Sequence, residues 1–195
     1  MKFPFPLVIA VPLLLGVGVV AQSQGSAQSA LTASADRKIA QIEHNGRLAH
    51  PDQVPTRLTE EEINAYLASG DLEFPAGVKS VQLQGQPGVI TGHARVDFDQ
   101  VRAGHGTSNP LLSMFSGVHN VEVVAHAHGA GHQGFVDVDT VSLDGVEIPR
   151  FVLQLFVEKY IQPKYPGIGL QSRFPLPDKI DTAVVGAHQV TLTQK

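Results

Sequence analysis

The chain has 195 residues, of which 43% are hydrophobic, and a formal net charge of −4 at pH 7. This length suits one domain with an ordinary core, and the mildly acidic balance, without a Lys/Arg cluster, argues against a nucleic-acid-binding protein. No cysteine is present, which excludes disulfides, a lipid-modified N-terminal cysteine and a cysteine nucleophile.

The first 23 residues have the pattern of an export signal. A lysine precedes an almost wholly apolar run from Leu7 to Val20, and small residues follow at Ala21 and Ser23. An uncleaved membrane anchor is the alternative, but the run is shorter than the roughly 20 residues that a spanning helix needs, and Pro12 interrupts it. We therefore expect residues 1–23 to be a signal peptide and the protein to be periplasmic or extracellular.

Residues 24–57 are predicted to form a linker with a short helix. The stretch through residue 35 is small and polar, which is the composition of a linker or of a frayed helix start. Asp36 to His44 fits a helix with Ile39 and Ile42 on one side, and the Asn-Gly pair that follows would end it. Little packing is expected before that helix.

A clearer helix signal opens the domain predicted for residues 58–195. Thr59 and Glu62 have the spacing of a capping box, in which each residue satisfies a backbone N–H of the other. The apolar spacing that follows predicts a helix from Glu60 to Ser69, and Gly70 ends it.

After this helix the hydrophobic period changes to two residues. Ile90, Ala94 and Val96 alternate with polar residues, so they predict a strand with one wet face. The segment VKSVQLQ is its expected hairpin partner, joined through Gly85 to Gly88.

The stretch AHAHGAGHQGFVDVD, residues 125–139, predicts a second hairpin. If the chain turns among its glycines, Ala127 lies opposite Val136, Ala125 opposite Val138, and His126 opposite Asp137. The stretch also contains the spacing G-x-G-x-x-G, but a dinucleotide site needs a helix after that motif, and here an alternating strand follows. Asp144-Gly145 predicts a further two-residue turn.

Pro149 to Gln162 is predicted to be the longest helix, because Pro149 suits a first turn and a broad apolar stripe follows. Residues 109–117 suit a one-turn apolar helix or a buried loop, and the tail alternates around Gly186 to His188 as one more hairpin. The fold class expected is α+β, with a curved antiparallel sheet of about six or seven strands packed on one long amphipathic helix and one or two shorter helices.

The first candidate site is apolar. Small residues on the predicted sheet face leave room for a helix, or for an acyl chain between helix and sheet. The alternative is that the helix itself fills this room. The candidate ligand-binding residues are Leu111, Leu112, Met114 and Phe115 in the apolar loop and Phe151, Leu155 and Phe156 on the helix.

The second candidate is a metal site at His126, His128 and Asp137, whose side chains share one strand face in the predicted register. His and Asp pairing across an exposed polar face explains the same pattern. No catalytic motif such as G-x-S-x-G or H-E-x-x-H is present in the sequence, so we expect neither enzymatic activity nor a cofactor.

Three segments, LTEEEINAYL, RVDFDQV and VSLDGVEIPRFVLQLFVEKYIQPKYP, resemble a group of uncharacterised exported bacterial proteins. More distantly, the chain is similar to small envelope proteins with a TULIP-like, lipid-associated half-barrel. The resemblance implies a curved antiparallel sheet around a long helix, with lipid bound in the gap, and it brings no catalytic residues.

The function expected is therefore that of an exported, non-enzymatic cell-envelope protein, peripherally associated with a membrane, that binds a lipid or another apolar ligand between helix and sheet. A metal-binding protein that uses the His/Asp strand face is one alternative. A structural domain that binds a partner protein by strand addition at a sheet edge is the other.

Overall fold

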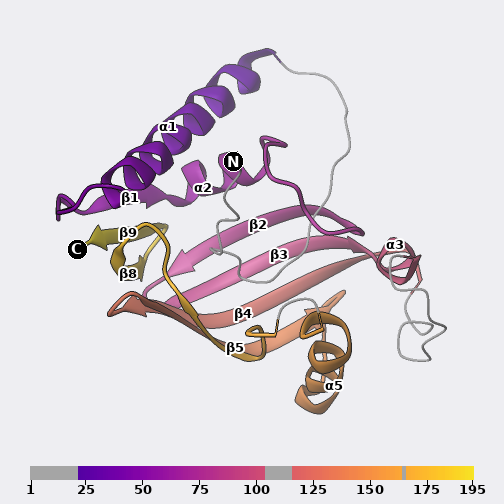
Figure 1. Cartoon of the computed structure of the whole chain (residues 1–195). Helices are drawn as coiled ribbons and strands as arrows, with labels where there is room; N and C mark the ends of the chain where they lie inside the picture. The colour runs from indigo at the N-terminus through magenta and orange to yellow at the C-terminus, as the bar shows by residue number, and fades with distance from the viewer. Residues whose placement is uncertain (1–21, 104–115, 164–165) are drawn as a thin grey trace.

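The computed structural model describes residues 22–103, 116–163 and 166–195, in which nine strands form one curved, entirely antiparallel sheet (Figure 1). The strand order is β1-β9-β8-β4-β3-β2, and β5 pairs with β4 on one edge and with β6 and β7 on the other. The α+β class is confirmed. The strands are β1 Thr56–Thr59, β2 Val78–Gln86, β3 Val89–Asp97, β4 Val118–Ala130, β5 Gln133–Leu143, β6 Val146–Glu147, β7 Gln171–Pro175, β8 Ile180–Gly186 and β9 Gln189–Gln194.

The hairpin of β4 and β5 has the register predicted from the sequence. Its turn residues Gly131 and His132 both have positive φ, 58° and 61°, as a two-residue type I′ turn requires. Ala127 lies opposite Val136, and Ala125 lies opposite Val138. The hairpins of β2 with β3 and of β8 with β9 are also confirmed.

A β-bulge interrupts the pairing of β4 with β5 directly after the pair Ala125–Val138, on the side away from the turn. Val124 pairs with Thr140 and Ala125 with Val138, so Asp139 has no opposite residue. The alternation of Val136 and Val138 on the apolar face therefore does not continue to Thr140, which pairs with Val124. Asp139 lies on the polar face with Asp137, as alternation predicts, and its carboxylate lies 2.7 Å from His126 Nδ1.

The long helix that packs on the sheet is α1, Gln22–Gly46, so the linker predicted through residue 35 is wrong. Ala35 and Ile42 are each 1% exposed and lie on one face because they are two helical turns apart. Small residues gave no amphipathic signal, yet they let α1 approach α2, Glu60–Leu67. The Thr32 hydroxyl donates to the Ala65 carbonyl at 3.2 Å.

The helix predicted from Pro149 to Gln162 is present but does not pack as expected. It consists of α5, Arg150–Phe156, and a π-helical turn η1, Val157–Ile161. No residue of α5 is buried, so the expectation that it is the main helix against the sheet is wrong. An apolar stripe shows that a helix has an apolar side but does not show what that side faces. The remaining described helix is α3, Phe98–Ala103.

Two buried clusters form the core of the described chain. The first lies between α1 and the strands β1, β8 and β9, and the second lies at the far end of β2 and β3. Gly129 permits the close pairing of β8 with β4, because a Cβ there would lie 2.8 Å from Ala183. The first cluster contains Ile42, Leu58, Leu176, Ile180, Ala183 and Leu192, and the second contains Val78, Ala94 and Val96.

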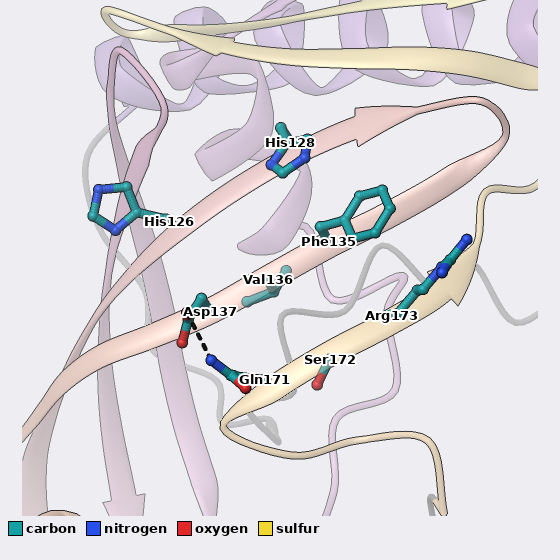
Figure 2. Close-up of a pocket in the computed structure, with 8 residues that line it drawn as sticks. All are labelled: His126, His128, Phe135, Val136, Asp137, Gln171, Ser172 and Arg173. Atoms are coloured by element: carbon teal, nitrogen blue, oxygen red, sulfur yellow. Dashed lines mark hydrogen bonds between the residues drawn. The ribbon is translucent and has the colours of Figure 1, made fainter.

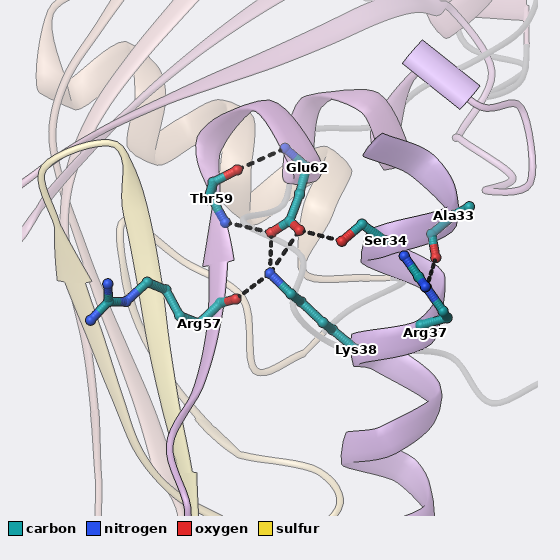
Figure 3. Close-up of polar contacts among 7 residues, drawn as sticks. All are labelled: Ala33, Ser34, Arg37, Lys38, Arg57, Thr59 and Glu62. Atoms are coloured by element: carbon teal, nitrogen blue, oxygen red, sulfur yellow. Dashed lines mark hydrogen bonds and ion pairs between the residues drawn. The ribbon is translucent and has the colours of Figure 1, made fainter. Parts of the chain in front are cut away.

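Glu62 connects α1, α2 and β1 (Figure 3). Only 5% of this residue is exposed. Its carboxylate accepts hydrogen bonds from the Thr59 N–H at 2.9 Å, the Ser34 hydroxyl at 2.6 Å and the Lys38 ammonium at 2.7 Å. The Thr59 hydroxyl accepts from the Glu62 N–H, which completes the predicted capping box. Lys38 also donates to the Arg57 carbonyl on β1.

The same contacts control the charge of Glu62. Burial by itself would raise the pKa of its carboxyl, but hydrogen bonds from Lys38, Ser34 and the Thr59 backbone outweigh burial and lower the pKa. A lowered pKa stabilises the fold at pH values above the unfolded-state pKa. This stabilisation is lost as the pH falls through the lower folded-state value.

Helix side chains also cover the edge of β2. The Asn64 side-chain amide donates to the Leu83 carbonyl and accepts from the Leu83 N–H, both at 2.8 Å, which copies the pairing of a neighbouring strand. Glu60 accepts from the Gly85 N–H at 2.9 Å. Strand addition by a partner is therefore blocked at these positions of β2.

The replacement Glu62→Ala is expected to lower the free energy of unfolding by about 3 kcal/mol, because it leaves the Lys38 ammonium and the Thr59 N–H without their buried acceptor. Chemical denaturation at pH 7 measures this change. The control is Glu61→Ala, an exposed position in the same helical turn, where we expect a change of no more than about 0.5 kcal/mol. Equal effects of the two replacements would contradict the role given to Glu62.

Candidate functional site

The apolar candidate is divided between described and undescribed parts of the chain. Phe151 is 69% exposed and Leu155 is 49% exposed, and their spacing places both on one side of α5. Phe156 is half-buried. The other side of the predicted groove, Leu111, Leu112, Met114 and Phe115, lies outside the described residues, so the groove itself stays a prediction.

The first residue of α5 attaches this helix to the edge of β5. The Arg150 guanidinium donates to the Val138 carbonyl at 3.0 Å and lies 3.8 Å from the Asp137 carboxylate. At the other end, the Gln162 N–H donates to the Val157 carbonyl at 2.9 Å, a π-type bond that widens the last turn. The exposed Phe151 and Leu155 are thus held in a defined place.

The metal candidate does not assemble into a ligand set. His126 Nδ1 lies 2.7 Å from an oxygen of Asp139, while the ring of His128 stacks on Phe135 with centroids 4.9 Å apart. Asp137 instead accepts from the Gln171 amide at 3.1 Å. Nowhere in the described residues do three His, Asp or Glu side chains gather closely enough to hold a metal ion.

These histidines instead line a hollow of about 360 Å³ on the polar face of β4, β5 and β7 (Figure 2). Cross-strand pairing arranges its side chains in two parallel rows. One row is His128, Phe135 and Arg173, in which the Arg173 guanidinium lies 5.2 Å from the centre of the Phe135 ring. The other row is His126, Asp137 and Gln171.

Sequence reasoning found the His and Asp side chains of this hollow but missed those from β7. Gln171, Ser172 and Arg173 lie in a strand of five residues that ends in proline, and so short a segment has no clear alternation. One signal could have revealed this strand. β5 pairs with β4 along one edge, so the backbone groups of its other edge, near Asp137, required a further strand to pair with.

A separate His–Asp pair joins the start of β4 to the turn after β5. His119 Nδ1 lies 2.6 Å from Asp144 Oδ2, and its Nε2 lies 3.0 Å from the Ser116 carbonyl oxygen. Both partners are acceptors, so this geometry is satisfied when both ring nitrogens carry protons. The Asp144 hydrogen bond accordingly raises the pKa of His119, and the charge of Asp99 acts in the same direction.

Comparison of the chain with protein-family models, curated proteins and solved structures finds no match. The family resemblance suggested by the sequence therefore stays a prediction. Among the helices of the described residues, none has the length and apolar content needed to cross a bilayer.

The raised pKa of His119 predicts a pH-dependent contribution to stability. It is fully present below the unfolded-state pKa of about 6.5 and is lost as the pH rises through the higher folded-state value. We expect the destabilisation caused by His119→Gln, measured by urea denaturation, to be larger at pH 5.5 than at pH 9.

Asp144→Asn is the matched control for this prediction. Asp144 has φ 49° in the turn before Gly145, a conformation that asparagine tolerates well, so the turn is kept while the charge is removed. In that background the pH dependence of the His119→Gln effect should disappear. Persistence of the dependence would show that Asp144 is not its source.

Proposed function

We propose that the protein is an exported, non-enzymatic protein of the cell envelope that binds lipid through the apolar side of α5. The single observation that carries the proposal is the exposure of Phe151 and Leu155 on a helix whose place is set by the bond from Arg150 to β5. Large apolar side chains gathered on an exposed surface mark contact sites for apolar ligands, membranes or partners.

The chemistry around these two residues favours a lipid. Arg150 lies at the start of α5 and the exposed Lys159 near the end of η1. Cationic residues beside an apolar stripe are typical of helices that lie in the membrane interface, because the cations reach anionic headgroups. Here Lys159 is the residue proposed for that contact, since the Arg150 guanidinium holds α5 on β5. The 12 residues of α5 and η1 are roughly 18 Å long, too short to span a hydrocarbon core of about 30 Å.

Two features of the sequence support the same function. The export signal predicted for residues 1–23 would bring the chain to the envelope. The resemblance to uncharacterised exported bacterial proteins covers VEIPRFVLQLF, which includes β6 and all of α5, and the more distant resemblance to lipid-associated half-barrel proteins includes the Gly-Val-Glu-Ile-Pro entry to this helix. Leu111, Leu112, Met114 and Phe115 are proposed to provide the second apolar side for an acyl chain.

The double replacement Phe151→Ser with Leu155→Ser is expected to weaken binding to vesicles of mixed neutral and anionic lipid by about 30-fold. Loss of partial burial of one Phe and one Leu side chain costs about 2 kcal/mol. Vesicle flotation of the full chain over a lipid titration measures the partition constant.

The matched control replaces two apolar residues of similar exposure elsewhere. Leu48 and Val54 are 42% and 67% exposed in the segment between α1 and β1. The double variant Leu48→Ser with Val54→Ser should bind vesicles as the unmodified chain does. If the unmodified chain does not float with vesicles, or if both double variants lose binding equally, the proposal fails.

A further inference from the structure

The polar face of the sheet carries a second hollow, of about 430 Å³, on β2, β3, β4 and β5. It has the same construction as the first, since cross-strand pairs form two rows. The first row is Gln82, His93, Glu122 and Ser142, and the second is Ser80, Arg95 and Asn120.

Strand β4 connects the two hollows. Its even-numbered residues alternate toward the polar face, with Asn120 and Glu122 in one hollow and His126 and His128 in the other. Six residues separate the middle of one hollow from the middle of the other, which corresponds to about 20 Å along the strand. A ligand that occupies both hollows is therefore long and extended.

The side chains of both hollows suit a ligand rich in hydroxyl groups. The amides of Gln82, Asn120 and Gln171 and the hydroxyls of Ser80 and Ser142 each combine donor and acceptor atoms. A sugar hydroxyl also donates and accepts, so it can satisfy such groups in both directions. Phe135, whose ring stacks on that of His128, adds an apolar surface for the C–H groups of a sugar ring.

The charge balance argues against other polymers. Each hollow has one arginine and one carboxylate, Arg95 with Glu122 and Arg173 with Asp137, so neither has an excess of one sign at pH 7. Nucleic acid and acidic polysaccharides need an excess of positive charge. A peptide added as a strand binds at a sheet edge, whereas both hollows lie on the face.

We propose that this polar face binds a neutral linear oligosaccharide that lies along β4 and contacts both hollows. Gln171 and Asp137 bind hydroxyls in the first hollow, and Gln82 and Asn120 do so in the second. Phe151 and Leu155 line neither hollow, so this proposal does not depend on the proposed lipid binding, and α5 approaches the first hollow only through Arg150, which lies 3.8 Å from Asp137.

The test is calorimetric titration of the full chain with four linear hexasaccharides, namely maltohexaose, cellohexaose, chitohexaose and mannohexaose, and with the corresponding disaccharides. At least one hexasaccharide is expected to bind saturably, and at least 10-fold more tightly than its disaccharide, because only the longer chain reaches both hollows. Gln82→Ala and Gln171→Ala should each weaken that binding by about five-fold through the loss of hydrogen bonds.

Gln84→Ala is the matched control, because Gln84 is exposed on the same face of β2, two residues from Gln82, and lines neither hollow. Its affinity should equal that of the unmodified chain. The lipid-site variant Phe151→Ser with Leu155→Ser should also keep sugar binding. Absence of saturable binding to all four hexasaccharides, or an effect of only one of the two pocket variants, would overturn the proposal.

Discussion

Glu62 is a buried carboxylate whose hydrogen-bond partners come from three separate elements, and the arrangement of the helical side of the molecule depends on it (Figure 3). A buried charge without partners costs several kcal/mol, so Ser34, Lys38 and Thr59 have to stay in place. These contacts position α1 on β1 and fix the start of α2. From α2, Asn64 then reaches the edge of β2.

This arrangement leaves two surfaces exposed, the apolar side of α5 and the polar face of the sheet. Because α1 and α2 take the role of the helical layer over the sheet (Figure 1), α5 is not needed there and keeps Phe151 and Leu155 exposed. The polar face of β4 stays open, with one hollow on each half of the strand. Under the two proposals, apolar and hydroxyl-rich ligands bind different parts of the molecule, namely the exposed side of α5 and the polar face of the sheet.

Local patterns in the sequence predicted the parts of the fold that depend on local chemistry. The capping box at Thr59, the turn at Gly131-His132 and the pairing of Ala127 with Val136 follow from neighbouring residues. The second half of the long helix α1 was predicted from Asp36 to His44, but its first half was missed because Ala and Ser side chains pack closely without an apolar stripe. The predicted metal ligands keep their register, but His126 lies against Asp139, His128 stacks on Phe135 and Asp137 accepts from Gln171. Neither the bulge at Asp139 nor the β7 side of the hollow has a local signal in the sequence.

Hydrogen–deuterium exchange of the full chain, with and without vesicles of mixed neutral and anionic lipid, tests the assignment of lipid binding to α5 most directly. The account predicts slower exchange of the amides in residues 150–161 when vesicles are present, because the helix is shielded in the membrane interface. It predicts unchanged exchange in β3 and β4. Protection centred on the polar face of β4, or unchanged exchange in residues 150–161, would contradict it.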